Sequence, residues 1–298
     1  MLLAFAAVLP GIFWTGAPDT AAVLREAGVK HIYVANAAAW KGVAEITADP
    51  VDFTKITKLK PPAVNYRFEN ASASRVPWID SNGWQYLRRP GGRFYYDAGG
   101  PLAIAEAFMW HADALVKADD ATLGPVAQML EYLRPLADSG ADWQQVADFA
   151  FIDDGTSAAG EVMNLLVRGN LLFRVTRAGD PKFKLNVQLG TKRYPLEQAK
   201  NPATMAQIIR ADLTDDNRSL RIYGSPVVVS RLESARGRVR VHLLNYDAAR
   251  KINGLRVRVA GEYPHSEGAK LQDYSASNGA TEFTLPELKT YVVIDLSR

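Results

Sequence analysis

The sequence contains no cysteine, and this absence excludes a whole branch of chemistry. Without thiols the chain has no disulfide, no thiolate metal site and no cysteine nucleophile. Histidine is also scarce: the chain has only His31, His111, His242 and His265, and no two of them show metal-ligand spacing. We therefore expect no metal and no cofactor.

The chain also lacks a strong charge of either sign. Its 35 basic and 32 acidic residues leave a formal charge of +3. The densest basic stretch, residues 231–240, places Arg236, Arg238 and Arg240 around a predicted strand, where alternation sends Arg238 and Arg240 to one solvated face. Nucleic-acid binding needs a concentrated basic patch, so we expect no nucleic-acid partner.

The apolar run at residues 1–10 is too short to span a membrane, so we expect no membrane partner. It resembles the core of a signal peptide, although no Lys or Arg precedes it. The alternative is a buried first strand. Because the run begins at Met1, we favour export to the periplasm or the medium over a cytoplasmic location.

The clearest pattern is at the C-terminal end of the chain. Polar and apolar residues alternate there in runs that turn residues separate, which is typical of antiparallel strands with one buried face. These runs are 238–246, 254–261, 281–285 and 290–296. We therefore predict a β-sandwich domain over residues 226–298.

The first 140 residues alternate predicted strands with predicted helices, which favours a parallel sheet. The strands are 12–15, 30–35, 63–68, 93–96 and 113–117, and the helices are 20–27, 101–110 and 123–136. A complete eight-stranded (β/α) barrel takes about 250 residues. The domain 1–140 is therefore either a partial (β/α) barrel or an open α/β sheet.

A second α/β block follows over residues 141–225. Its helices are predicted at 157–169 and 202–213, between strands at 148–152, 171–176, 185–189 and 220–223. This pattern indicates a small doubly wound, flavodoxin-like domain. The predicted fold class is thus α/β, with a barrel-like domain, a flavodoxin-like domain and a terminal sandwich.

This order of parts, together with the strand Val241-His-Leu-Leu-Asn-Tyr246, resembles the layout of glycoside hydrolases. The nearest likeness is to beta-galactosidases that carry a glutamine-amidotransferase-like trimerisation domain between the barrel and a final β-domain. The resemblance implies a carbohydrate ligand and a glycoside hydrolase that uses paired carboxylates. The alternative is a non-catalytic relative that binds glycans or assembles with partners, and a homo-oligomer is left open.

Functional groups in such a fold emerge at the carboxyl ends of its strands. Glu69 and Asp97 each end an aromatic-rich strand, and two carboxylates facing one cleft could act as general acid and as base or nucleophile on a glycosidic bond. We therefore predict this pair as catalytic, unless both are ordinary solvated residues or helix caps. Other strand-end or neighbouring residues predicted to bind substrate are Trp14, Asn36, Arg67 and Tyr95.

The segment 74–93 combines aromatic and polar side chains as sugar sites do, with flat apolar faces for the ring and polar groups for the hydroxyls. We predict that Trp78, Asp80, Asn82 and Trp84 contribute to substrate binding. The alternative is a packed loop in which residues 80–83 form a turn.

Overall fold

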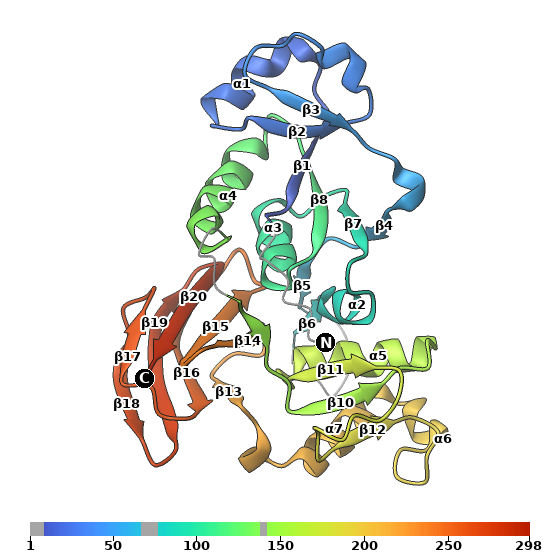
Figure 1. The fold of residues 1–298 in the computed structure, drawn as a ribbon, viewed down its shortest axis with the longest axis vertical. Coiled ribbons are helices and arrows are strands. Elements are labelled where there is room, and N and C mark those ends of the chain that lie inside the picture. The colour runs from blue at the N-terminus through green and yellow to red at the C-terminus, as the bar shows by residue number, and fades with distance from the viewer. Residues whose placement is uncertain (1–8, 67–76, 138–141) are drawn as a thin grey trace. The chain divides into compact units, whose positions relative to one another are not determined.

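The computed structural model describes residues 9–66, 77–137 and 142–298 of the chain (Figure 1). The chain forms two compact units. One comprises Phe5–Pro62 and Arg89–Asp142 and is called the barrel unit here. The other, called the sandwich unit, contains Ala63–Arg88 and Trp143–Arg298. The predicted boundaries at residues 140 and 225 stay a prediction.

The barrel unit is built on a six-stranded sheet in the order β3-β2-β1-β8-β7-β4, and every neighbouring pair is parallel. Its strands are β1 (Gly11–Trp14), β2 (His31–Val34), β3 (Thr47–Pro50), β4 (Thr57–Leu59), β7 (Arg93–Tyr96) and β8 (Asp113–Ala118). From β1 through β3, and then from β4 through β7 and β8 back to β1, neighbours follow chain order, as in a (β/α) barrel. The two edge strands are β3 and β4, so the barrel is a partial one.

Side-chain alternation gives this sheet two different faces. Ile12 and Trp14 lie on one face and are almost fully buried, as are most residues of the helix α3 (Gly100–Met109). Phe13, Tyr95 and Leu115 form a cluster on the other face. Gly11 is required beneath that cluster, because a Cβ there would lie 2.6 Å from the Tyr33 ring.

The α-helices α1 (Ala21–Glu26) and α4 (Leu123–Ala137) of the barrel unit agree with the sequence-based prediction. Short 3₁₀ helices occupy Pro18–Thr20, Ala37–Trp40 and Phe53–Lys55, and the last two were not predicted. Pro101 lies in the first turn of α3, where its missing N–H costs nothing. No helix of the described residues combines the length and apolar character needed to cross a bilayer.

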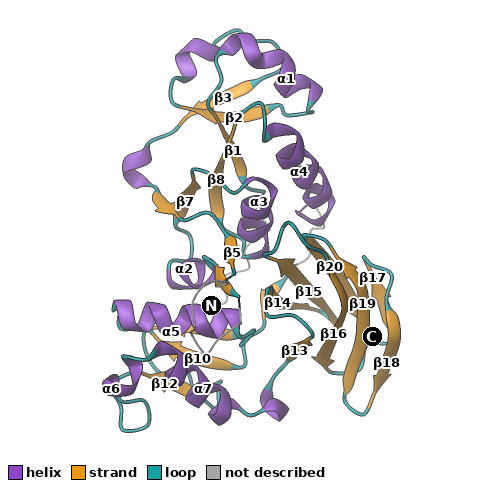
Figure 2. Cartoon of the chain, turned by 180° about the vertical axis from the view of Figure 1, so that it is seen from behind, coloured by secondary structure: helices purple, strands orange, loops and turns teal. Residues whose placement is uncertain are grey.

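The sandwich unit contains the predicted small α/β block. Its three strands are parallel in the order β11-β10-β12. They are β10 (Phe149–Ile152), β11 (Phe173–Thr176) and β12 (Asn186–Gln188), with helices α5 (Ser157–Arg168), α6 (Leu196–Ala199) and α7 (Pro202–Leu213). Figure 2 shows these helices gathered around the strands. Thr156 caps α5 and Asn201 caps α7 by accepting a backbone N–H, which fixes where each helix begins.

The predicted β-sandwich is confirmed. One sheet has the order β13-β16-β19-β18 and the other β17-β20-β15-β14-β9. Its strands are β9 (Gln144–Gln145), β13 (Leu220–Tyr223), β14 (Val228–Ala235), β15 (Arg238–Asn245), β16 (Ile252–Ala260), β17 (His265–Glu267), β18 (Gln272–Ser277), β19 (Ala280–Leu288) and β20 (Tyr291–Ser297). One apolar core takes buried side chains from both sheets, among them Val241, Val257 and Phe283.

The segment 63–88 differs from its prediction. The strand predicted over 63–68 is present as β5 (Ala63–Asn65), but it pairs antiparallel with β6 (Trp78–Asp80) instead of joining the parallel sheet. Pro61 and Pro62 precede it and have no N–H to donate to a ladder. In the segment where only a turn was expected, the helix α2 (Gly83–Arg88) begins directly after Asn82.

Gly160 on α5 lets α2 approach closely. A Cβ at this position would lie 2.9 Å and 3.0 Å from the Trp84 ring and 3.1 Å from an Arg88 nitrogen. We expect Gly160→Ala to lower the free energy of unfolding by about 1–3 kcal/mol, measured by urea denaturation, because the tight contact must be rebuilt. Gly124→Ala is the matched control. Gly124 is also helical and has no atom within 4 Å of its Cβ position, so this change should stabilise by about 0.5–1 kcal/mol. Equal effects of the two substitutions would contradict the close-contact explanation.

Asp148 lies just before β10, and its carboxylate accepts a hydrogen bond of 3.0 Å from the backbone N–H of Ser219, which precedes β13. Its other carboxyl oxygen is buried without a hydrogen-bond partner among the described residues. Burial raises the pKa of Asp148, and the hydrogen bonds from Ser219 only partly offset this effect. The ionised carboxylate is therefore disfavoured in the folded chain.

This raised pKa predicts a pH-dependent effect of Asp148→Asn. The protonated Asp148 carboxyl makes its full contribution to folding stability below the pKa that it has in the unfolded chain. This contribution is lost as the pH rises through the higher pKa that it has in the folded chain. Asparagine keeps the acceptor oxygen and does not titrate. The stability of the variant relative to the wild type should therefore increase from acid to neutral pH, as measured by urea midpoints. A difference that stays constant with pH would contradict this account.

Candidate functional site

The predicted site residues divide between the two units. Trp14, Asn36, Tyr95 and Asp97 belong to the barrel unit, and Trp78, Asp80, Asn82 and Trp84 belong to the sandwich unit. Glu69 and Arg67 lie outside the described residues. The predicted pair of Glu69 and Asp97 therefore stays a prediction.

Asp97 lies at the carboxyl end of β7, where the sequence placed it. Its carboxylate forms an ion pair with Nζ of Lys58 on β4, at 2.5 Å. The hydrogen bond from Lys58 lowers the pKa of Asp97, and the charges of Lys58 and Lys117 add to this effect. The side chains of Asp97 and Lys58 remain 39% and 66% exposed, so the pair is accessible to a ligand.

Two other carboxylates at this end of the sheet accept hydrogen bonds from nearby backbone N–H and hydroxyl groups. Asp52 accepts hydrogen bonds from the N–H and hydroxyl of Thr54, and Asp119 does the same for Thr122. These bonds lower the pKa of both carboxyls. Asp52, Asp97 and Asp119 are thus all held in the ionised form. A general acid for glycoside cleavage needs the opposite, a carboxyl whose pKa is raised.

Aromatic rings lie on the same face of the sheet as Asp97. Phe53, from the connection between β3 and β4, makes edge contacts with Phe13 at 5.1 Å and with Tyr95 at 4.9 Å between ring centroids. Phe13 and Tyr95 are nearly buried, whereas Phe53 is 42% exposed. Burial, and then the charge of Asp97, raise the pKa of Tyr95. We call Phe53, Lys58, Tyr95 and Asp97 the barrel-end site.

Sequence analysis named Tyr95 and Asp97 as candidates but not Phe53 and Lys58. Lys58 sits in a strand of three residues, which is too short for alternation to be recognised, and Phe53 lies in a single 3₁₀ turn. Lys58 could have been recognised only from the parallel pairing of β4 with β7, which places Lys58 opposite Tyr95. This pairing can be inferred only after β4 has been identified as a strand.

Trp14 and Asn36 occupy different environments at this end of the sheet. Trp14 is 1% exposed, and its indole N–H donates to the hydroxyl of Thr20 at 3.1 Å. It therefore contributes to the core of the barrel unit. Asn36 is exposed two residues after the end of β2, and its side chain does not cap the 3₁₀ turn that follows.

The four predicted residues of the sandwich unit form mostly internal contacts. The Trp78 indole donates to Asp80 at 3.0 Å, and Asn65 donates to the other Asp80 oxygen at 2.8 Å. The guanidinium of Arg168 stacks on the Trp78 ring at 3.8 Å. Trp84 packs on Gly160, and Asn82 is buried at the start of α2. These side chains secure β6 and α2 within the unit.

Open α/β folds bind ligands at the carboxyl ends of their strands. At the carboxyl end of β10, the Arg88 side chain occupies this position. Asp153 is buried there, and Arg88 from α2 binds it through two hydrogen bonds of 3.0 Å and 2.7 Å. Arg88 also donates to the carbonyl of Thr156 at 2.9 Å. Asp154 holds the N–H and hydroxyl of Thr156, the residue that caps α5. Both carboxylates therefore stabilise the start of α5.

The strand that carried the family resemblance also has a structural role. The ring of buried His242 contacts Glu233 at 3.0 Å and the Tyr291 hydroxyl at 2.5 Å. Asn245 is fully buried, and its side-chain amide donates hydrogen bonds to carbonyls of nearby loops. The Tyr246 hydroxyl forms a hydrogen bond of 2.8 Å with the Ser81 hydroxyl. This motif thus secures the sandwich and its contact with residues 77–88.

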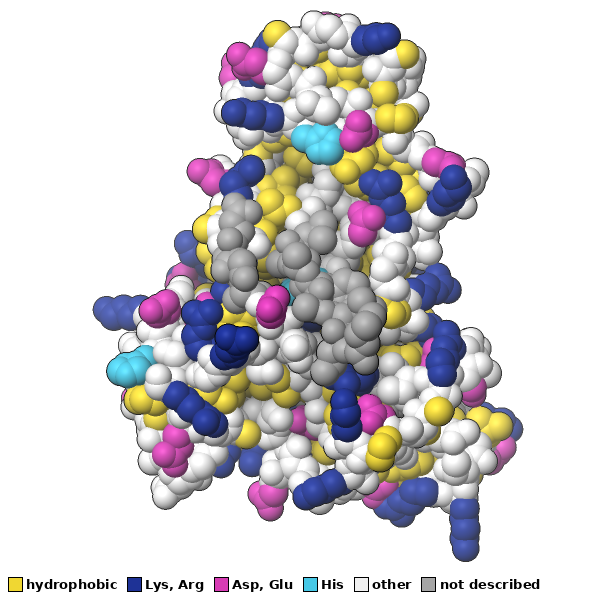
Figure 3. Space-filling model, viewed as in Figure 1, with side chains coloured by type: hydrophobic (Ala, Val, Ile, Leu, Met, Phe, Trp, Pro, Cys, Tyr) yellow, Lys and Arg dark blue, Asp and Glu magenta, His cyan; other side chains and the backbone are white. Residues whose placement is uncertain are grey.

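No metal site emerges among the described residues, and the face drawn in Figure 3 shows no concentrated patch of one charge. No group of three or more potential metal ligands occurs among the described residues. Figure 3 shows basic and acidic side chains interspersed on the face in view. The expectation that the chain binds no nucleic acid stays a prediction.

Comparison with known proteins supports the fold. The structure is similar to alpha-L-fucosidase isoenzyme 2 from Paenibacillus thiaminolyticus, with a TM-score of 0.58 at 9% sequence identity, over 88% of this chain and 70% of that one. The chain shares its fold with a glycoside hydrolase. A weaker likeness, to the GH42 beta-galactosidase Gan42B, has a TM-score of 0.41 at 8% identity and covers 81% of this chain and 53% of that one. No protein-family model and no curated protein matches the sequence.

Proposed function

We propose that this chain binds carbohydrate at the barrel-end site. The observation that carries the proposal is the half-exposed Phe53 ring against Tyr95, together with the accessible Lys58–Asp97 pair, at the carboxyl end of a parallel sheet. Lys58 lies on β4, and Asp97 directly follows β7, the strand that carries Tyr95. An exposed ring offers a flat apolar face for a sugar, and the charged pair offers both donors and acceptors for its hydroxyls. Ligands bind at this end of the strands in α/β barrels.

The described carboxylates at this end of the sheet are suited to binding. Cleavage of a glycosidic bond uses one ionised carboxylate and one protonated carboxyl. Asp52, Asp97 and Asp119 all have lowered pKa values, so each is suited to accept hydrogen bonds and none to donate a proton at neutral pH. Within this proposal, Asp97 binds sugar hydroxyls. We also propose that the middle α/β block is an amidotransferase-like module without catalytic activity that serves assembly. A further part of the proposal is that the chain is exported.

The binding proposal is tested with a glycan array that includes α-L-fucosides and β-galactosides, followed by calorimetry on the best ligand. We expect Phe53→Ala to weaken affinity about tenfold, because a central aromatic contact is lost. Tyr223→Ala is the control, since Tyr223 is similarly exposed, at 46% against 42%, and lies on β13 of the other unit. No binding by the wild type, or equal weakening by both substitutions, would refute the proposal.

A hydrolysis assay separates the two functions. The wild type, Glu69→Gln and Asp97→Asn are incubated with the same glycans, and the release of reducing sugar is measured. We expect no release above background from any of the three. Release by the wild type that both substitutions abolish would replace the binding proposal with a hydrolase that uses the pair of Glu69 and Asp97.

A further inference from the structure

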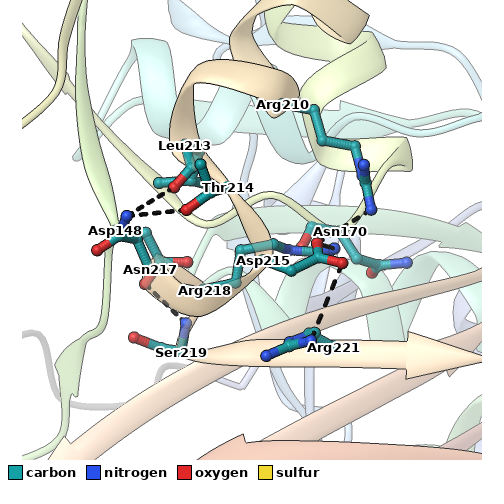
Figure 4. Close-up of polar contacts among 10 residues, drawn as sticks. All are labelled: Asp148, Asn170, Arg210, Leu213, Thr214, Asp215, Asn217, Arg218, Ser219 and Arg221. Atoms are coloured by element: carbon teal, nitrogen blue, oxygen red, sulfur yellow. Dashed lines mark hydrogen bonds and ion pairs between the residues drawn. The ribbon is translucent and has the colours of Figure 1, made fainter.

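Three arginines of the sandwich unit converge on a single carboxylate (Figure 4). Arg210 from α7 donates to Asp215 at 3.0 Å, and Arg218 donates to the same oxygen at 3.3 Å. Arg221 from β13 lies 3.9 Å from the second oxygen. Figure 4 shows Arg210 and Arg221 approaching Asp215 from two sides. We call these four residues the arginine cluster.

Positive charge is in excess in the arginine cluster. Burial lowers the pKa of Arg218, and repulsion from Arg210 adds to this effect, while Asp215 offsets only part of it. The charge of Asp148 also offsets part of it, although burial raises the pKa of Asp148 itself. A group that carries negative charge would therefore be stabilised beside Asp215.

The cluster also contains unused hydrogen-bond donors. The Nε–H groups of Arg218 and Arg221 are buried and have no acceptor among the described residues. The side chain of Arg218 is only 8% exposed. Buried donors of this kind are rare in native proteins and are usually satisfied by a partner, an ion or water.

The backbone at this position is held in an unusual conformation. Thr214, directly before Asp215, has φ 59° and ψ 158°, a region that is almost exclusive to glycine. Asn217 donates to the Leu213 carbonyl and the Thr214 hydroxyl, both at 3.0 Å, and so helps to hold the turn. Such strain persists only where the surroundings impose it, and it concentrates at ligand sites.

We propose that the arginine cluster is a binding site for a small oxyanion, the chemistry shared by sulfate, phosphate and carboxylate groups. Arginine presents paired donors that match the geometry of such groups. Arg210 is 52% exposed and Asp215 is 46% exposed, so the ligand reaches the cluster from their side. Asp215 occupies part of the site in the absence of a ligand and is displaced or shared when the anion binds. This site lies in the other unit from the barrel-end site and does not depend on the proposed function.

The test is calorimetric titration of the full chain with millimolar inorganic sulfate, against chloride at equal ionic strength. We expect saturable binding that Arg210→Gln weakens about tenfold, the loss typical of one charge-assisted hydrogen bond. Arg193→Gln is the matched control. Arg193 is an exposed arginine outside the cluster, and it pairs with Asp212 of α7, the helix that also carries Arg210. Its substitution should leave sulfate affinity unchanged. Asp215→Asn removes the competing carboxylate and should tighten binding.

A second series identifies the source of the anion. A sulfated oligosaccharide and its desulfated counterpart are titrated alongside inorganic sulfate. Tighter binding of the sulfated oligosaccharide than of inorganic sulfate, with no binding of the desulfated form, assigns the site to anionic substituents of a glycan. Equal binding of inorganic sulfate and the sulfated oligosaccharide assigns it to the oxyanion itself. The proposal is overturned if sulfate binding does not saturate, or if Arg210→Gln binds sulfate as well as the wild type does.

Discussion

Replacing Asn245 with aspartate should lower the free energy of unfolding by about 3–5 kcal/mol at pH 7. The amide nitrogen of Asn245 lies within 3.0 Å of the Asp247 carbonyl and 2.7 Å of the Arg250 and Lys289 carbonyls. Its oxygen accepts the N–H of Asp247 at 3.0 Å. Aspartate has the same shape but no donor, so buried carbonyls would face a buried carboxylate.

The measurement is urea denaturation followed by far-UV circular dichroism, and Asn253→Asp is the matched control. Asn253 is exposed on the strand β16 of the same unit, so the same chemical change should cost less than about 0.5 kcal/mol there. Amide hydrogen exchange should also increase at residues 246–251 and 288–290, which the Asn245 side chain connects. A cost at Asn245 no greater than at Asn253 would contradict the role assigned to this side chain.

The strands and helices with strong periodicity could be predicted from sequence alone. The helices α5 and α7 lie within a few residues of their predicted ranges, because each buries one regular face. The strand β15 and the helix α3 also lie close to their predicted ranges, although nearly all of their residues are buried. The strands β3 and β4 were missed because each has four residues or fewer and little apolar content. They are recognisable as strands only because the parallel sheet supplies their partners.

The site was harder to predict than the fold. Asp97 was named as a candidate because it follows an apolar strand, a position that sequence shows directly. Its partner Lys58 is 39 positions earlier in the chain, and the parallel pairing of β4 with β7 brings the two together. Trp84 carried plausible binding chemistry in the sequence. Its packing against α5 depends on Gly160, which has no side chain to reveal this contact.

The ion pair of Arg88 and Asp153 predicts the second large effect. The side chains of Asp153 and Arg88 are 1% and 12% exposed, so Asp153→Asn leaves a nearly buried guanidinium without its counter-charge. We expect a loss of about 3–5 kcal/mol in the free energy of unfolding. In contrast, Glu197→Gln breaks an ion pair with Lys200 whose side chains are 79% and 72% exposed, and should cost less than about 1 kcal/mol.

A double-substitution cycle separates the cost of the unpaired charge from the loss of packing. Arg88→Met removes the buried cation while keeping an unbranched side chain against Trp84, so it should destabilise the wild type strongly and the Asp153→Asn variant much less. Urea denaturation of the wild type, both single variants and the double variant gives the coupling free energy. Additive losses would mean that each side chain acts through its own contacts, such as the bonds to Thr156 and Gly155, and that the ion pair does not hold α2 against α5.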